Sequence, residues 1–97
     1  MRHGEYKEPG GKLIQVDFEL RGNRLSQVKV SGDFFLYPDE ALETIVAAVE
    51  GTAADLPATS RADLVRAALA AGVEWLGASP DGLAIAIERA LAAGESL

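Results

Sequence analysis

Alternating apolar and polar residues mark the first third of the chain as strand-forming. Over residues 12–21, apolar side chains occupy every second position, at Ile14, Val16, Phe18 and Leu20. Val28 and Val30 repeat the pattern further along. A period of two is typical of strands with one buried face. We therefore expect two strands here, and residues 5–8 could add a short edge strand.

Turn signals separate these strands. Pro9, Gly10 and Gly11 form one signal, and Gly22 with Asn23 forms the next. Strands joined by such short turns pair as antiparallel hairpins. The first part of the chain is therefore predicted to be an antiparallel meander.

The register of the second hairpin depends on the length of its loop. A two-residue turn would pair Phe18 with Gln27, which mixes apolar and polar side chains on one face. A three-residue loop would pair Phe18 with Val28 and Val16 with Val30. Because the longer loop keeps the apolar face together, we predict the three-residue loop.

From Pro38 onward the apolar period becomes three to four, as in amphipathic helices. Pro38 suits the first helical position, and Asp39 and Glu40 complement the positive end of the helix dipole. Gly51 is a suitable helix terminator. The expected buried stripe of this helix comprises Leu42, Ile45, Val46 and Val49.

A second helix is expected after a loop around Pro57. Ser60 and Asp63 have the spacing of a capping box, with Asp in place of the usual Glu or Gln. The helix is predicted to continue to Gly72. Its apolar face would comprise Leu64, Val65, Ala68 and Leu69.

A third helix is expected near the end of the chain. Residues 73–78 are predicted to be a connector, with Trp75 packed on the core. Ser79 and Pro80 then begin the helix, and Gly94 closes it. Its apolar face would comprise Leu83, Ile87, Ala90 and Leu91.

Composition supports a single mixed domain over residues 1–97. The chain is 48% hydrophobic, and 97 residues suffice for one core. All 17 alanines lie after residue 40, which separates a helical part from a strand-forming part. We therefore predict an α+β fold, in which a two- to three-stranded antiparallel meander is packed on one face by about three helices.

Charge and cysteine content narrow the function classes. The net charge is −6: residues 1–37 carry six Lys or Arg against five Asp or Glu, and residues 38–97 carry three against ten. No basic patch is dense enough to suggest a nucleic-acid partner. No run of about 18 apolar residues suggests a membrane span, and residues 1–5 lack the features of a signal peptide. A cytoplasmic location is expected.

The residues of catalytic sites are scarce in this chain. The absence of cysteine excludes thiol catalysis, disulfides and cysteine-ligated metal. His3 is the only histidine, and a surface position near the terminus is expected for it. There is no serine–histidine arrangement, cluster of metal ligands or Walker-type phosphate loop. We therefore do not expect the chain to catalyse a reaction alone.

Two short motifs carry the remaining functional signal. Gly10 and Gly11 place backbone N–H groups beside the Lys12 ammonium, an arrangement that can bind an anion, although an ordinary hairpin turn has the same features. In residues 32–35, the glycine permits unusual backbone angles or a close backbone approach. Phe34 and Phe35 should point to opposite faces, so that one enters the core and the other is free to contact a partner.

The order of these motifs resembles a known family. Residues 7–14, KEPGGKLI, precede a two-strand hairpin, and Gly32-Asp33-Phe34-Phe35 precedes a helix that begins with proline. In this order and spacing, the chain resembles the C-terminal accessory domain of lipoate–protein ligases. The resemblance covers nearly the whole chain and is strongest over residues 7–50. The fold also resembles iron–sulfur scaffold proteins and sulfur acceptors, but those use cysteines, which this chain lacks.

The resemblance implies a role beside a larger protein. In that family a catalytic domain activates lipoate with ATP to lipoyl-AMP, then passes the lipoyl group to a lysine of an acceptor domain. This chain would be a stand-alone accessory subunit that forms a heterodimer with a separate catalytic subunit, and would serve lipoyl-acceptor proteins only indirectly. ATP, Mg²⁺ and lipoate would be bound in the complex, and none of them by this chain alone.

The resemblance also suggests roles for the motif residues. Candidates for facing the ATP phosphates are Gly10, Gly11 and Lys12, although Lys12 could instead form a salt bridge in docking. Candidates for contacting the partner are Lys7, Gly32, Asp33, Phe34 and Phe35. The alternative interpretation is a small structural or regulatory interaction domain with no link to lipoate.

Overall fold

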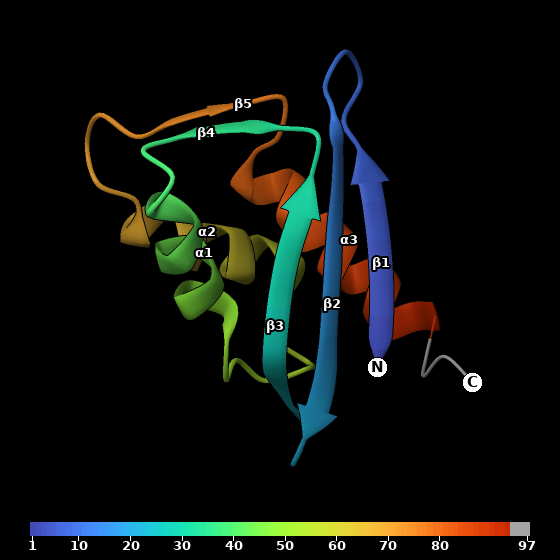
Figure 1. Ribbon diagram of the computed structural model, residues 1–97. Helices are drawn as coiled ribbons and strands as arrows, with labels where there is room; N and C mark the ends of the chain where they lie inside the picture. The colour runs from blue at the N-terminus through green and yellow to red at the C-terminus, as the bar shows by residue number, and fades with distance from the viewer. Residues whose placement is uncertain (94–97) are drawn as a thin grey trace.

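The computed structural model describes residues 1–93, in which three helices lie against one face of a three-stranded sheet and a two-stranded ribbon lies at one end (Figure 1). In chain order the elements are β1 (Arg2–Lys7), β2 (Leu13–Arg21), β3 (Arg24–Gly32), β4 (Phe35–Tyr37), α1 (Ala41–Val49), α2 (Ala58–Ala68), β5 (Glu74–Leu76) and α3 (Pro80–Ala93). The predicted α+β class is confirmed. No helix within residues 1–93 combines the length and the apolar character needed to cross a membrane.

The main sheet is the predicted antiparallel meander, in the order β1–β2–β3. The expected edge strand is present as β1 and is longer than residues 5–8. The helices lie on one face of the sheet, and α3 crosses behind β1 and β2 (Figure 1). The helix α3 and the strand β1 approach closely at Gly4, where a Cβ atom would overlap the Ala86 carbonyl oxygen. Only glycine therefore allows α3 to lie so close to β1.

The loop predicted for the second hairpin is wrong, although the register beyond it is right. Leu20 pairs with Leu25 across a two-residue turn, and yet Val16 pairs with Val30 as predicted. A bulge opposite Phe18 absorbs the extra residue and restores the apolar face. Gln27 in the bulge has φ 54°, a conformation uncommon for residues other than glycine.

A carboxylate supports this bulge. Glu50, which follows α1, accepts hydrogen bonds from the amides of Gln27 at 3.0 Å and Val28 at 2.9 Å. Two backbone donors that the bulge turns away from β2 are thereby satisfied. The alternating pattern alone carries no information about Glu50, which explains why the loop length could not be derived from it.

The first helix begins later than predicted. Pro38 does not occupy its first turn, because α1 starts at Ala41. Residues 38–42 form a tighter turn, in which Ala41 donates to the Pro38 carbonyl at 3.0 Å. The predicted end is confirmed, since α1 stops at Val49 and Gly51 has φ 78°. The buried residues are Ala41, Ile45 and Val49, with Leu42 and Val46 partly buried.

The second helix differs from the prediction at both ends. It begins at Ala58, directly after Pro57, so Ser60 lies inside the helix and the predicted capping box does not form. Pro57 itself occupies the N-cap position, and no side chain caps this end of the helix. The helix ends at Ala68 rather than near Gly72. Its buried face consists of Arg61, Ala62 and Val65, whereas Leu64 is exposed.

Residues 73–78, predicted to be a connector, contain a strand. β5 pairs antiparallel with β4, with Phe35 opposite Leu76. Trp75 packs against the core, as predicted. The last helix is confirmed from Pro80, with Leu83, Ile87 and Ala90 buried. The predicted terminator Gly94 lies outside the described residues.

Candidate functional site

The two sequence motifs meet at one end of the molecule. The β1–β2 turn and the β4–β5 ribbon both lie at the top of Figure 1. Between them is a shallow hollow of about 270 Å³. Its lining comprises Gly10, Gly11, Lys12, Asp33, Phe35, Leu76 and Gly77. The fold therefore brings the glycine turn beside Asp33 and Phe35, which follow it by more than twenty positions in sequence.

The glycine turn is not an open cradle of backbone donors. The Gly11 amide donates to the Glu8 carbonyl at 2.8 Å, and the Lys12 amide donates to the Gly77 carbonyl at 2.7 Å. The turn itself therefore uses the Gly11 amide as a donor, and this N–H group is not directed toward the hollow as an open anion ligand. Gly10, with φ 71°, permits the tight geometry. The exposed side chain of Lys12 is left as the cationic group of the turn.

Gly77 places Lys12. A Cβ atom at Gly77 would lie 2.7 Å from Cγ of Lys12, and Gly77 has φ 89°. The aliphatic stem of the lysine therefore lies directly against the backbone of residue 77. This contact and the hydrogen bond to the Gly77 carbonyl hold residue 12 against the end of β5.

The turn is also anchored to the last helix. The Glu8 carboxylate accepts a hydrogen bond from the Ser79 hydroxyl, and that hydroxyl in turn accepts one from the Gly82 amide at 3.1 Å. A Cβ atom at Gly82 would overlap the Glu8 carboxylate, so a larger residue there would displace that side chain from its present position. A negative charge at the first turn of a helix complements the helix dipole. The geometry of the turn thus depends on residues about seventy positions away.

Phe34 and Phe35 point to opposite faces, as predicted. Phe34 is half-buried and meets the Trp75 ring edge-on, with centroids 5.8 Å apart. Phe35 is 55% exposed. Leu76, opposite Phe35, and Tyr37 are also exposed large hydrophobic residues. Phe35, Tyr37 and Leu76 together are called the ribbon patch below, and contiguous exposed apolar groups of this kind are typical of contact surfaces.

The remaining candidates are Gly32, Asp33 and Lys7, and of these Asp33 lines the hollow. Gly32 has φ 149°, and a Cβ atom there would overlap the Leu13 carbonyl oxygen, so its role is to let β2 and β3 approach. Asp33 donates its amide to the same carbonyl at 3.0 Å and is exposed. Lys7 is exposed at the end of β1 but does not line the hollow. The charged groups of the lining are therefore Lys12 and Asp33.

A second polar cluster lies on the helix-free face of the main sheet. His3 contacts Asp17 through Nδ1 at 2.7 Å and Glu5 through Nε2 at 2.8 Å. The hydrogen bond with Glu5, followed by that with Asp17, raises the pKa of His3 above its usual value. All three side chains are at least one-third exposed, so they form a surface network. Within residues 1–93, no group of three or more His, Asp or Glu side chains is arranged to hold a metal ion.

Sequence reasoning missed two residues of the hollow, Leu76 and Gly77. Both were missed because the strand β5, which carries Leu76 and precedes Gly77, was predicted to be a connector. A signal was available, because the aromatic-centred run Glu74-Trp75-Leu76 is followed by a glycine, as in short strands. The run was too short to distinguish from a loop by periodicity.

Comparisons of sequence and of structure both find a similarity to a lipoate–protein ligase. No known protein-family profile matches the chain. A relative from Thermoplasma acidophilum, lipoate-protein ligase A subunit 2, is 35% identical over 40 residues, which are 41% of this chain and 43% of that subunit. The sequence match thus spans less than half of the relative.

A solved structure extends the similarity to most of the chain. It describes a bipartite lipoate protein ligase and its E2 lipoyl domain from the same archaeon. One of its chains is similar to this one with a TM-score of 0.65 and 26% identity, over 89% of this chain and 90% of that chain. The resemblance to the accessory part of lipoate–protein ligase, predicted from the motifs, is confirmed by both comparisons.

Proposed function

We propose that this chain, which resembles the accessory subunit of a two-chain lipoate–protein ligase in both sequence and fold, performs that role beside a separate catalytic subunit. The pair would activate lipoate with ATP to lipoyl-AMP and then transfer the lipoyl group to a lysine of a lipoyl-acceptor protein. The chain would act in the cytoplasm, as one half of a heterodimer.

One observation supports this proposal most directly. The glycine turn, Asp33 and Phe35 come from separate motifs, and they line a single hollow at one end of the molecule. These are the motifs on which the resemblance depends. A surface that combines a cation with neighbouring exposed apolar side chains is suited to completing a site on another protein.

The proposed contribution to chemistry is the Lys12 ammonium. Adenylation increases negative charge on the α-phosphate and on the departing pyrophosphate, and a fixed cation stabilises such charge. The amides of Gly11 and Lys12 are already bonded within the fold, so the side chain is the group able to reach outward. ATP, Mg²⁺ and lipoate would be bound mainly by the catalytic subunit.

The ribbon patch would supply the contact with that subunit. Phe35 and Leu76 are 55% and 58% exposed and lie side by side across β4 and β5. Exposed aromatic residues at the centre of a contact usually contribute much of its binding energy. Docking through this patch would bring the adjacent Lys12 to the surface of the partner.

Reconstitution from two purified chains tests the proposal. Lipoyl-AMP formation would be measured for the catalytic subunit alone, and then with this chain or with its Lys12→Ala variant at saturating concentration. We expect the wild-type chain to restore adenylation. We expect the variant to lower its rate by about a hundredfold while binding normally, in line with the loss of one stabilising group. Arg21→Ala, an exposed cation at the far end of β2 that lines neither the hollow nor another surface proposed for docking, is the matched control.

Two outcomes would contradict parts of the proposal. If this chain neither binds the catalytic subunit nor alters lipoyl-AMP formation, the accessory role fails. If Lys12→Ala adenylates normally at saturating subunit, Lys12 has no role in the site. Transfer from preformed lipoyl-AMP should be unaffected by Lys12→Ala, because no pyrophosphate leaves in that step.

A further inference from the structure

The outer edge of β3 carries backbone groups that no strand pairs with in the described residues. β3 is an edge strand of the sheet. Hydrogen-bonded pairs alternate along an antiparallel ladder. The Asp33 amide bonds to the Leu13 carbonyl at 3.0 Å, which fixes that alternation. It follows that the N–H and C=O groups of Val30 point away from β2, toward the outer edge.

The chain covers only the first half of this edge. Gly51 and Thr52 bond to the two backbone groups of Leu25, and Glu50 binds the amides of Gln27 and Val28. Beyond that point, the outward groups are the carbonyls of residues 28 and 30 and the amides of residues 30 and 32. Exposed edge groups of this kind can template the pairing of another strand.

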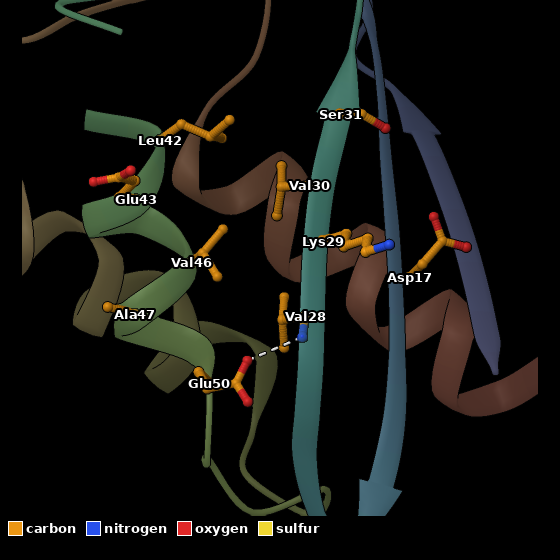
Figure 2. A pocket seen from close by; sticks show the side chains of 10 residues that line it. All are labelled: Asp17, Val28, Lys29, Val30, Ser31, Leu42, Glu43, Val46, Ala47 and Glu50. Carbon is orange, nitrogen blue, oxygen red and sulfur yellow. Dashed lines mark hydrogen bonds between the residues drawn. The ribbon is translucent and has the colours of Figure 1, made fainter. Parts of the chain in front are cut away.

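An apolar groove runs along the uncovered half. It has a volume of about 610 Å³ and lies between β3 and α1. In Figure 2, Leu42 and Val46 point from α1 toward Val28 and Val30 on β3. Strand addition gains affinity from backbone hydrogen bonds and specificity from pockets for alternate side chains. This groove offers both features beside one another.

Charge around the groove restricts what can occupy it. Glu43 and Glu50 lie along its α1 side, and Figure 2 shows Lys29 extending toward β2 rather than into the groove. The acidic side disfavours a fatty acid or another carboxylate. It favours an extended peptide with alternating apolar side chains and a neighbouring basic residue.

We infer that the β3–α1 groove binds an extended segment of the catalytic subunit, which adds a fourth strand to the main sheet beside β3. This inference rests on the proposed function. It places a second contact on a surface different from the ribbon patch. The segment would cover Leu42 and Val46 and satisfy the outward amide of Val30.

Amide hydrogen exchange in the two-chain complex tests the inference. The chain would be labelled with ¹⁵N, and exchange would be followed alone and with saturating catalytic subunit. We expect the amides of Val30 and Gly32 to exchange at least about tenfold more slowly in the complex. The Glu5 amide is the internal control, because the alternation along β1 and β2 points it outward from the opposite edge of the sheet.

Matched substitutions test the walls of the groove. Leu42→Ser should weaken the complex by about tenfold, whereas Leu64→Ser, an exposed leucine of α2, should leave the affinity within about twofold. Glu43→Lys should also weaken it, and Glu40→Lys, an equal charge change outside the groove, should not. Glu40 and Glu43 are both exposed and both lie at the start of α1, so the two charge changes perturb the helix dipole in the same sense and their difference reports the groove.

The outcomes distinguish this inference from the proposed function. A complex that forms with unchanged exchange at Val30 and Gly32 would overturn the groove contact and leave the accessory role standing. If the exchange of the Val30 amide instead slows as the concentration of this chain is raised without the catalytic subunit, a second copy of the chain is the occupant of the groove. That result would also overturn the inference. Absence of any complex would contradict both.

Discussion

Arg61 is the fully buried charged residue among residues 1–93, and its surroundings explain how the fold accepts it. Its guanidinium donates to the carbonyls of Ala53 at 2.6 Å and Leu56 at 3.3 Å, and to the Thr52 hydroxyl at 3.4 Å. Burial lowers the pKa of Arg61, and the Glu88 carboxylate, 3.6 Å away, partly opposes that effect. Arg61 therefore fastens the loop between α1 and α2 to the body of the protein.

Replacing Arg61 should be costly. Arg61→Leu would leave the part-buried carbonyls of Ala53 and Leu56 without their donor, and we expect the free energy of unfolding to fall by about 3 kcal/mol. Arg66→Leu on the same helix is the control. Arg66 pairs with Asp63 and Asp81 on the surface, and such exposed ion pairs contribute little to stability because solvent screens them. Urea denaturation of the two variants measures the difference, and equal losses would contradict the anchoring role of Arg61.

At the scale of single residues, the sequence predicted side-chain orientations that depend on neighbouring residues. It missed those that depend on contacts with residues further along the chain. The opposite orientations of Phe34 and Phe35 follow from the geometry of an extended chain, and the structure confirms them. The burial of Arg61 depends on carbonyls five to eight positions earlier in the chain. Its spacing of four from Val65 was a usable signal, because both then lie on one helix face.

At the scale of elements, strongly periodic segments were predictable and short ones were not. β2 and α3 were recognised because their apolar pattern persists over many residues. β5 has three residues and gave no usable period. The bulge in β3 could not be derived from the pattern, because the Glu50 carboxylate that supports it follows a different element. The candidate site was affected most, because its hollow is completed by β5.

The β4–β5 ribbon gives a matched pair of substitutions. Phe34→Ala removes a ring packed on Trp75 and the core, and should lower the free energy of unfolding by about 2–3 kcal/mol. Phe35→Ala removes an exposed ring and should change stability by less than about 0.5 kcal/mol. In the proposed complex, Phe35→Ala should weaken binding by about tenfold. Denaturation and titration with the catalytic subunit measure the two effects. Equal, large destabilisation by both changes would show that both rings belong to the core.

At the scale of the whole molecule, the candidate site depends on contacts between the two ends of the chain. The glycine turn follows β1, whereas Gly77 and Ser79, which hold it, come just before α3. The sequence identified the turn and the Gly32–Phe35 motif separately, and the resemblance to lipoate–protein ligases related them. Periodicity could not reveal the hydrogen bond between Glu8 and Ser79, because nothing local marks a partner seventy-one positions away.

Loosening that connection should alter the site without unfolding the protein. Ser79→Ala removes the hydroxyl that donates to Glu8 and accepts from the Gly82 amide. We expect a stability loss of about 1 kcal/mol, as for other helix caps, and faster hydrogen exchange at the Lys12 amide, because the turn is held less firmly. If Lys12 must be positioned for adenylation, the rate with saturating subunit should fall by about tenfold. Ser60→Ala, inside α2, is the control and should change neither quantity. If exchange of the Lys12 amide is unchanged in Ser79→Ala, the contact with Gly77 alone holds the turn. If exchange is faster but adenylation is normal, the position of Lys12 does not limit the rate of the reaction.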